Sequence, residues 1–446
     1  MTTTIGRSLR FVANDLTGHT ALLTDHYELT MLQAALAAGT AERRSVFELF
    51  ARRLPEGRRY GVVAGVGRML ESLERFRFGP DEIAFLREQR VVDEPTLDWL
   101  SSYRFSGNVW GYPEGEVYFP HSPVLVVEST FAEAVLLETL LLSIYNHDSA
   151  IASAASRMTA AAGDRPCIEM GSRRTHEQAA VASARAAYVA GFATSSNLES
   201  RLRYGVPTAG TSAHSFTLLH DSEEDAFRAQ VAALGVGTTL LVDTYDVRAG
   251  VETAVRVAGR ELGGVRLDSG DLGSLAVDVR AQLDALGATG TRIVVTSDLD
   301  EHAIAALAAA PVDVYGVGTQ VVVGSGHPTC GFVYKLVARA SSDGTLVDVA
   351  KKSIDKVSLG GRKYALRRLD AAGTATAEVI GIGSPARGDH NDRNLLVPLV
   401  RDGALVGTEP LEAGRERHRR SRAELPLTAL QLQRGEPAIP TELVGP

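Results

Sequence analysis

Several features are scarce or missing in this sequence of 446 residues, and each shortage excludes a class of protein. There are only two cysteines, Cys167 and Cys330, too few for a disulfide framework or a structural zinc site. Both lie in apolar surroundings, so we expect buried thiols. Lys and Arg number 46 against 54 Asp and Glu, a formal net charge of −8, so no binding to nucleic acid through a basic surface is expected.

Long hydrophobic runs are lacking as well. The longest apolar stretches, at residues 134–145 and 303–311, fall short of the roughly 20 residues that a membrane span requires. No basic-then-apolar signal pattern opens the chain. We therefore expect no membrane contact and a cytoplasmic location. The composition, 45% hydrophobic and 22% charged, is that of a globular protein and not of a disordered one.

The hydrophobic pattern divides the chain into four segments. Residues 1–21 are polar without a sustained period and are predicted to form a loose arm. Residues 22–150 combine a helical period with short alternating runs, which predicts an N-terminal α+β domain. Residues 151–340 form the predicted barrel domain described next. Residues 341–446 hold weaker strand-like pieces, and we expect this C-terminal segment to pack back on the small domain.

Seven short apolar runs, each ending in polar or glycine residues, recur in the middle of the chain. They begin at positions 167, 192, 207, 239, 264, 292 and 312, and most of them are separated by segments with a helical pattern of apolar residues. This spacing is close to the βα rhythm of a barrel or a doubly wound sheet. Polar residues gather at the C-terminal ends of the runs, and in (β/α) barrels the active site lies at the C-terminal ends of the strands. The predicted fold class is therefore α/β, an irregular (β/α) barrel with a smaller α+β domain, and not an open sheet.

The densest group of polar residues lies at 264–271, Gly-Val-Arg-Leu-Asp-Ser-Gly-Asp. Arg266 and Asp268 alternate with apolar residues, so a strand points both side chains to one face, where they need partners or a ligand. Ser269, Gly270 and Asp271 then supply a hydroxyl, a turn and a second carboxylate. These groups suit ribose hydroxyls, or an Mg2+ ion held by Asp271 through water. The alternative is an internal salt bridge at the end of a strand.

Residues 316–319, Gly-Val-Gly-Thr, end the last clear run and are a candidate phosphate site. Gly316, Gly318 and Thr319 form a glycine-rich turn whose backbone N–H groups can meet a phosphate, and late barrel strands commonly hold one. Ser297, at the polar end of the preceding run, strengthens this interpretation. The alternative is an ordinary tight turn.

Two further groups of polar residues follow other runs. His214 stands just beyond a strand terminus, close to Thr211, where a histidine serves as acid, base or nucleophile. A lone histidine is more often structural. Glu169, Arg173 and Arg174 end the first run, and the two arginines suit the carboxylate or phosphate of an anionic ligand. The alternative for them is a solvated helix start.

Two features are ambiguous when considered alone. Tyr27 follows Thr24 and Asp25 at the start of a helix, as an aromatic neighbour of an N-cap. The basic stretch from Lys351 to Lys363 predicts either a solvated face or, near the barrel mouth, a contact with polyphosphate.

Taken together, these motifs resemble one family, the nicotinate phosphoribosyltransferases. Six motifs follow the family's order within residues 20–370, at 23–30, 169–174, 191–197, 210–215, 264–271 and 316–319. The resemblance implies a type II phosphoribosyltransferase fold and a homodimer with sites at the subunit interface. It also implies the reaction of nicotinate, phosphoribosyl pyrophosphate, ATP and water, with Mg2+, to nicotinate mononucleotide, pyrophosphate, ADP and phosphate, a step of NAD biosynthesis.

The resemblance also implies roles for single residues. His214 matches the family's phosphohistidine, which takes the γ-phosphate of ATP. Tyr27 corresponds to an aromatic side chain that stacks on the pyridine ring in the partner subunit's site. Arg266 matches an arginine near the nicotinate and the ribose phosphate, and Asp268 a carboxylate near the ribose, which can stabilise an oxocarbenium-like transition state. Two threonines match ligand contacts, Thr211 and Thr319.

The choice of pyridine substrate depends on Ser196. In the related nicotinamide enzyme the aligned residue is an aspartate, which would repel the carboxylate of nicotinate. Here neutral donors stand beside Arg173 and Arg174, so nicotinate is favoured. The alternatives are a nicotinamide or quinolinate phosphoribosyltransferase, and a non-catalytic mononucleotide-binding sensor, although a sensor has no need of the phosphoryl acceptor His214.

Overall fold

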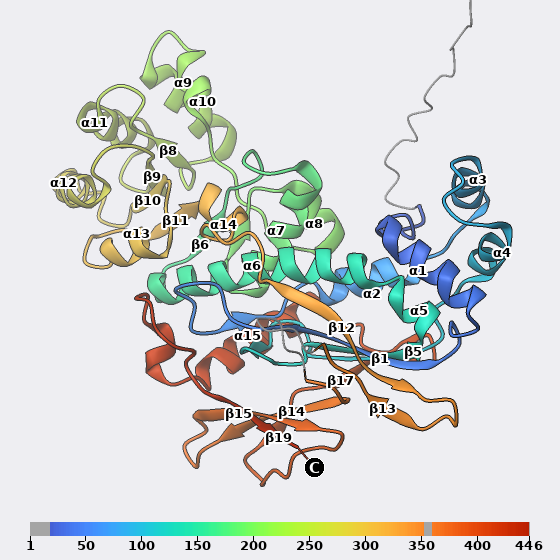
Figure 1. The fold of residues 1–446 in the computed structure, drawn as a ribbon. Helices are drawn as coiled ribbons and strands as arrows, with labels where there is room; N and C mark the ends of the chain where they lie inside the picture. Colours follow the sequence, from blue (N-terminus) through green and yellow to red (C-terminus); the bar gives the residue numbers. More distant parts are fainter. Residues whose placement is uncertain (1–17, 352–358, 446) are drawn as a thin grey trace, which may run out of the picture.

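The computed structural model describes residues 18–351 and 359–445, so most of the predicted arm at 1–21 lies outside the described residues. An antiparallel seven-stranded sheet occupies one half of the molecule (Figure 1). Its strands come from both ends of the chain, in the order β13 (Leu346–Asp348), β12 (Phe332–Ala340), β1 (Arg44–Ala51), β5 (Leu125–Thr130), β3 (Asn108–Gly111), β17 (Val397–Arg401) and β18 (Ala404–Leu405). All residues of β1 except Arg44 are buried, as expected for a central strand.

Helices from the first part of the chain lie over one face of this sheet (Figure 1). They are α1 (His26–Ala37), α2 (Val66–Glu74), α3 (Pro80–Glu88), α4 (Glu94–Ser102), α5 (Phe131–Val135) and the long α6 (Glu138–Ala162). Apolar side chains of these helices and of β1, β5 and β12 form one hydrophobic core. The short pair β2 (Gly61–Val62) and β4 (Val117–Tyr118) packs against α6.

A six-stranded parallel sheet forms the other half. Its order is β7 (Thr194–Ser195), β6 (Cys167–Glu169), β11 (Val314–Val317), β10 (Arg292–Ser297), β9 (Gly264–Leu267) and β8 (Thr239–Leu241). Six of the seven predicted runs are strands. The run beginning at 207 contributes only one bridge, between Ser195 and Thr208. Among the described residues β7 and β8 do not pair, so the α/β class is confirmed and the parallel sheet is an incomplete barrel.

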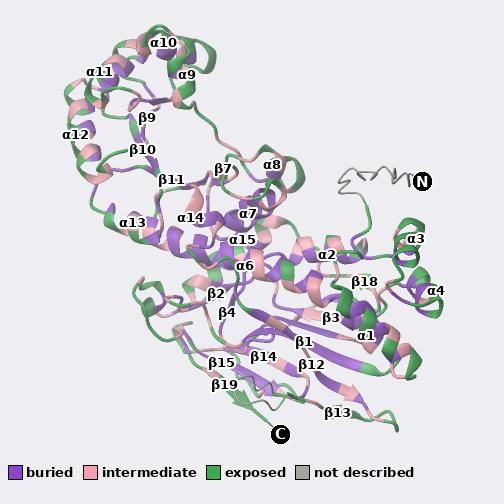
Figure 2. Cartoon of the chain, turned by 45° about the horizontal axis from the view of Figure 1, so that its top comes forward, coloured by how far each residue is buried: buried purple, intermediate pink, exposed green. Residues whose placement is uncertain are grey.

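Helices surround the parallel sheet, and a second core lies between them and its strands. Figure 2 shows α10 to α13 in an arc around its outer side. The helices of this half are α7 (Glu177–Val189), α8 (Leu198–Tyr204), α9 (His214–Leu218), α10 (Glu223–Leu234), α11 (Val247–Ala258), α12 (Leu272–Ala285), α13 (Glu301–Ala306) and α14 (Thr319–Val322). No helix in the described part of the chain is both long and apolar enough to cross a bilayer. Cys167 and Cys330 are buried free thiols, as predicted.

The C-terminal segment contacts both halves. Besides β17 and β18 it forms a four-stranded sheet, in the order β16 (Arg393–Asn394), β14 (Lys363–Leu369), β15 (Ala375–Ile382) and β19 (Thr441–Val444). It ends with α15 (Leu411–Ala423), the 3-10 turn η1 (Leu427–Leu430) and β19. Arg415 of α15 donates hydrogen bonds to the carbonyls of Tyr188, Gly191 and Phe192, at the C-terminal end of α7. The predicted boundaries at residues 150 and 340 fall within α6 and at the end of β12, and stay predictions.

The basic stretch at 351–363 does not reach the barrel mouth at its described end. Lys363 is buried in β14, and its Nζ lies 2.7 Å from Oε2 of Glu48 on β1. A buried, paired ammonium is not available to a polyphosphate, so that prediction is wrong for Lys363. Residues 352–358 lie outside the described part of the chain.

Candidate active site

The parallel register brings the polar strand ends together at one edge of the incomplete barrel. Arg266 of β9 lies opposite Val294 of β10, and Thr296 of β10 opposite Gly316 of β11. A cavity of about 250 Å³ opens at this edge. It is lined by Met170, Arg173, Arg174, Arg266, Asp268, Thr296, Ser297, Asp298, Gly316, Gly318 and Thr319. Eight of these eleven residues were predicted as site residues, and the structure brings them together here, while their roles stay predictions.

The two terminal nitrogens of the Arg266 guanidinium are hydrogen-bonded, but its Nε is not. Nη1 donates to the hydroxyl of Thr211 at 2.7 Å and Nη2 to the carbonyl of Ser212 at 2.8 Å, whereas the buried Nε has no partner. In the described residues Arg266 makes no ion pair with a carboxylate within 4 Å, so an internal salt bridge to Asp268 is excluded. Burial lowers the pKa of Arg266 because the charged form is desolvated, although the nearby carboxylates of Asp268 and Asp243 favour it. This cation is therefore available to an anionic ligand.

Asp243, at the end of the β8 run, organises the turn after β9. Its Oδ2 accepts hydrogen bonds from the backbone N–H of Asp268 at 2.9 Å and from the hydroxyl of Ser269 at 2.8 Å. The carboxylate of Asp268 in turn accepts a hydrogen bond from the hydroxyl of Thr296. The side chain of Asp243 is 2% exposed, and its Oδ1 has no hydrogen-bond partner in the described structure. An unsatisfied buried carboxylate oxygen is costly unless a positive charge or a ligand faces it.

His214 provides that facing group. It begins α9, and its Nε2 lies 3.9 Å from Oδ1 of Asp243 and 3.8 Å from Oδ2 of Asp268. Its Nδ1 is 3.2 Å from the hydroxyl of Thr244. The side chain is 40% exposed, so one edge of the imidazole is open to a ligand. Two carboxylates therefore face one ring nitrogen, an arrangement that can offset positive charge developing on the ring.

Arg173 and Arg174 are exposed at the cavity and make no ion pair among the described residues. Only glycine fits at position 316 in the cavity wall without a shift of its neighbours, because a Cβ there would lie 2.4 Å from Cγ2 of Thr296 and 2.9 Å from Sδ of Met170. The site thus combines guanidinium groups that have no carboxylate partner with a closely packed glycine, Gly316, in the cavity wall. Such a site is suited to an anionic ligand.

The side chain of Glu169 and the backbone of Ser196 are engaged with the protein. The Glu169 carboxylate is buried, with Oε1 accepting from the backbone N–H of Gly171 and Oε2 from the hydroxyl of Ser195, each at 2.5 Å. Burial raises the pKa of Glu169, while these two hydrogen bonds oppose the shift. The backbone N–H of Ser196 donates to the Glu169 carbonyl at 2.8 Å, while its side chain is exposed. Glu169 thereby fixes the end of β6 against β7, and its contact with a substrate stays a prediction.

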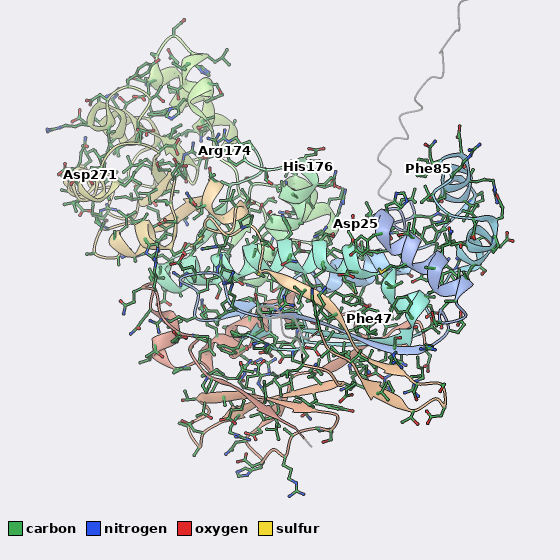
Figure 3. The ribbon with its side chains drawn as sticks, viewed as in Figure 1. Asp25, Phe47, Phe85, Arg174, His176 and Asp271 are labelled. Carbon is green, nitrogen blue, oxygen red and sulfur yellow. The ribbon has the colours of Figure 1, made fainter. Side chains whose placement is uncertain are left out.

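Gly270 and Asp271, which follow Ser269, do not line the cavity. Gly270 has a φ of +85° in the turn, and Asp271 caps α12 by accepting from the backbone N–H of Ser274 at 3.2 Å and from its hydroxyl at 3.0 Å. These hydrogen bonds lower the pKa of Asp271. Figure 3 shows Asp271 beside α12, away from Arg174. The described residues contain no group of three His, Cys, Asp or Glu side chains that could hold a metal, so an Mg2+ site at Asp271 stays a prediction.

Tyr27 lies on the other side of the molecule. It is on the exposed surface of α1, and Figure 3 shows the preceding Asp25 far from Asp271. Burial, followed by the charge of Glu138, raises the pKa of Tyr27 to about 12, so its hydroxyl stays protonated. Within a single chain, Tyr27 and His214 are therefore too far apart to act on the same ligand.

The sequence-based site was incomplete in two respects. Asp243 and Thr296 were not selected, yet both are polar residues at the C-terminal end of an apolar run, the same signal that singled out Asp268. Met170, which lies against Gly316, could not be predicted as a site residue, because an apolar residue after a strand does not indicate a functional role.

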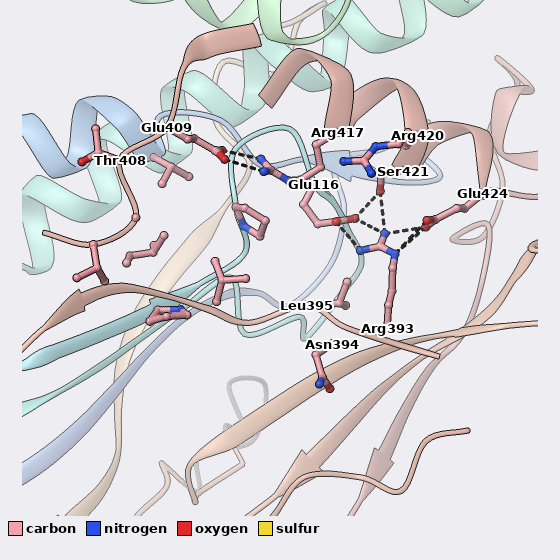
Figure 4. Close-up of a pocket in the computed structure, with 17 residues that line it drawn as sticks. Glu116, Arg393, Asn394, Leu395, Thr408, Glu409, Arg417, Arg420, Ser421 and Glu424 are labelled. Atoms are coloured by element: carbon pink, nitrogen blue, oxygen red, sulfur yellow. Dashed lines mark hydrogen bonds and ion pairs between the residues drawn. The ribbon is translucent and has the colours of Figure 1, made fainter. Parts of the chain in front are cut away.

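A larger cavity of about 490 Å³ lies between α15 and β17 (Figure 4). Its charged side chains are largely satisfied by one another. Arg393 pairs with Glu116 and Glu424, each with a closest distance of 2.7 Å, and Arg417 pairs with Glu409 at 2.6 Å. This cavity therefore lacks the uncompensated charge found at the strand ends.

Comparisons with known proteins agree with the geometry. Residues 22–146 match the nicotinate phosphoribosyltransferase (NAPRTase) N-terminal domain. The chain is 59% identical to nicotinate phosphoribosyltransferase pncB1 of Mycobacterium tuberculosis over 95% of both chains, and 39% identical to nicotinate phosphoribosyltransferase of Bacillus subtilis over 78% of this chain and 73% of that one. The crystal structure of human nicotinic acid phosphoribosyltransferase superposes with a TM-score of 0.80 at 26% identity, covering 94% of this chain and 97% of the human one. The chain belongs to the nicotinate phosphoribosyltransferase family.

Proposed function

We propose that this chain is an ATP-coupled nicotinate phosphoribosyltransferase. It joins nicotinate to the phosphoribosyl group of phosphoribosyl pyrophosphate and releases pyrophosphate, while ATP and water become ADP and phosphate. The product, nicotinate mononucleotide, leads to NAD. The observation that carries this proposal is the placement of His214 against Asp243 and Asp268 at the edge of an arginine-lined cavity.

The two imidazole nitrogens have different tasks. Nε2 faces the carboxylates of Asp243 and Asp268, whose negative charges favour the N–H on this nitrogen and the lone pair on Nδ1. Nδ1 attacks the γ-phosphorus of ATP, the bond to the ADP oxygen breaks, and phosphohistidine forms. Water later attacks that phosphorus, which returns neutral His214 and releases phosphate. The carboxylates offset the charge of the imidazolium-like ring in between.

Transfer to the sugar needs no protein nucleophile. The anomeric carbon loses pyrophosphate and acquires oxocarbenium character, and the carboxylate of Asp268 stabilises that positive charge. Arg266, Arg173 and Arg174 offset the negative charge of phosphates and of the nicotinate carboxylate. Mg2+ is expected to accompany the pyrophosphate, but the described side chains do not form a ligand set for it, and we derive no step through the metal.

Nicotinate is favoured over nicotinamide or quinolinate because Ser196 is neutral and two exposed arginines stand nearby. Direct competition of the three pyridines in a pyrophosphate-release assay decides among them. A sensor that binds a mononucleotide without turnover would release no pyrophosphate in that assay.

We further propose that the active form is a homodimer in which Tyr27 enters the partner's site. Large apolar side chains are exposed on two short helices next to the site, and monomeric proteins seldom leave such groups uncovered together. They are Leu198 and Leu202 of α8, and Leu218 and Leu219 at the end of α9. The phosphorylated co-substrates support a cytoplasmic location.

His214→Ala tests the assignment of the phosphoryl acceptor. The variant is expected to lose ATP coupling and to retain some ATP-independent transfer, because Arg266 and Asp268 remain. Incorporation of phosphate from ATP labelled at the γ-position, acid-labile and base-stable, should map to the peptide that contains His214. His390→Ala, at an exposed position in the C-terminal segment, is the matched control and should keep full coupling. ATP hydrolysis that stays in step with product formation in His214→Ala would show the assignment to be wrong.

A further inference from the structure

A separate cationic cavity of about 270 Å³ lies away from the strand ends. It is enclosed by the loop before β2, by α6, by the start of α13, by the loop after α14 and by the segment after η1. Arg58, Arg157 and Arg434 line it together with His302 and His327. The proposed reaction does not use any of these residues.

Arg58 is a buried cation without a counter-ion. It is 4% exposed, and its Nη2 and Nη1 donate only to backbone carbonyls, those of Gly324 at 2.6 Å and Ala150 at 3.4 Å. No carboxylate of the described residues lies within 4 Å of it. The nearest groups that could ionise are the thiol of Cys330 and the phenol of Tyr118, and burial raises the pKa of both, so they stay neutral. Glu301 also acts on Arg58 from a longer distance, but the positive charge of Arg157 opposes it. Burial correspondingly lowers the pKa of Arg58.

The carboxylates of this cavity are already engaged by other groups. Glu301 pairs with Nε of Arg157 at 2.9 Å and accepts a hydrogen bond from Ser325 at 2.6 Å. Glu56 lies 2.7 Å from Arg434. The cavity therefore carries one uncompensated positive charge even when both of its histidines are neutral. A buried charge of this kind is expensive unless an anion occupies the adjoining space.

We propose that this cavity binds a small inorganic oxyanion of the phosphate class, with Arg58 as its main ligand. A tetrahedral oxyanion is small enough for the cavity and accepts several N–H donors at once, from the guanidinium groups of Arg58 and Arg434 and the ring of His327. Because these three residues lie in separate segments, the bound anion joins the loop before β2 to the C-terminal segment. It therefore stabilises the fold at a place remote from His214.

The experiment separates this cavity from the catalytic site, which also attracts phosphates. The thermal unfolding midpoint of the full chain is measured in inorganic phosphate and in chloride of equal ionic strength, in an Arg266→Met background that weakens catalytic-site binding. Phosphate should raise the midpoint, with an apparent affinity at least tenfold weaker after Arg58→Met. Arg77→Met, at an exposed position elsewhere, should leave the phosphate effect unchanged.

Two further measurements keep the test decisive if Arg58→Met fails to fold. The rim variant Arg434→Ala/His327→Ala should lose several-fold in phosphate affinity, and a crystal soaked in selenate should show anomalous density beside the Arg58 guanidinium. Equal phosphate effects in the parent and rim variants, together with no density at Arg58, would overturn the proposal. A midpoint raised by ribose 5-phosphate but not by inorganic phosphate would also contradict it. None of these readouts depends on transfer activity.

Discussion

At the scale of single residues, Asp243 is the group whose removal should affect the chemistry most specifically. Asp243→Asn retains an oxygen that accepts from Asp268 and Ser269, but removes the negative charge that faces Nε2 of His214. The imidazole then loses stabilisation of its charged, phosphorylated form. We expect phosphohistidine formation to slow by roughly a hundredfold or more, in line with the loss of a carboxylate that orients a catalytic histidine.

Rapid-quench measurement of the phosphoenzyme tests this expectation. Asp246→Asn is the control, because Asp246 lies three residues further on and caps α11 through the backbone N–H of Ala249. Its replacement should alter stability slightly and leave the phosphorylation rate unchanged. An unaltered rate in Asp243→Asn would remove Asp243 from the mechanism.

His418 predicts a pH dependence of stability. It is buried in α15 with Nε2 2.8 Å from the hydroxyl of Ser156, and burial lowers its pKa from 6.5 to about 3. Below pH 6.5 the unfolded chain binds a proton at this position that the folded chain does not, so stability falls as the pH falls. The slope from this residue approaches about 1.4 kcal/mol per pH unit.

Urea unfolding at pH 7.5 and pH 5.5 measures that slope. His418→Gln keeps a polar group near Ser156 but does not titrate, so the variant should lose less stability than the parent chain over this interval. Parallel pH profiles for the two proteins would contradict the assignment to His418.

How much of the site could be predicted depended on whether a residue's role is visible along the chain. Arg266, Asp268 and Gly316 stand in motifs whose strand context places them at the cavity, and the structure brings them together there. Asp243 acts on Asp268 from a neighbouring strand, 25 positions earlier, and only the register of β8 against β9 reveals the contact. Asp271 was selected for its carboxylate, but its position next to a helix makes it an N-cap.

At the scale of elements, the attachment of α15 depends on a glycine in a distant loop. Gly115 has a φ of +83°, and a Cβ there would lie 2.0 Å from the carbonyl oxygen of Gly414 in α15. Gly115→Ala should therefore displace α15 and weaken the contacts of Arg415 with the end of α7. We expect it to destabilise the fold by at least about 2 kcal/mol more than backbone strain alone.

Gly39→Ala provides the matched comparison. Gly39 also has a positive φ, +65°, but a Cβ there would meet nothing within 4 Å, so only the strain of about 1 kcal/mol remains. The difference between the two variants in free energy of unfolding isolates the clash with α15. Equal losses in both would mean that α15 is not held closely at Gly115.

Elements were predictable where the chain pairs locally in a repeated unit. Six of seven apolar runs became parallel strands, because each unit returns to the sheet through its own helix. The run at 207 did not, since it begins with Pro207, which has no N–H to donate to a ladder. The pairing of β1 with β12, and of β3 with β17, joins segments nearly 300 residues apart that no local pattern connects.

At the scale of the whole molecule, α1, which carries Tyr27, and α9, which begins with His214, lie on opposite sides of one chain (Figure 1), although both residues are assigned to one proposed reaction. A homodimer with shared sites resolves this separation, because each barrel would receive Tyr27 from its partner. The arrangement predicts complementation between two variants that are each defective. In a dimer of one Tyr27→Ala subunit and one His214→Ala subunit, one site keeps both residues and the other site lacks both.

Equal mixing of the two variants by refolding or co-expression should therefore restore ATP-coupled activity to about a quarter of the parent value, because half of the dimers are mixed and each has one intact site. The control mixes Tyr27→Ala with the double variant Tyr27→Ala/His214→Ala, in which no combination rebuilds a site. Activity of the first mixture that merely equals the average of its two parents would mean that Tyr27 acts within its own chain or not at all. Since the structure of one chain separates the two side chains, only the second of these explanations would then remain compatible with the fold.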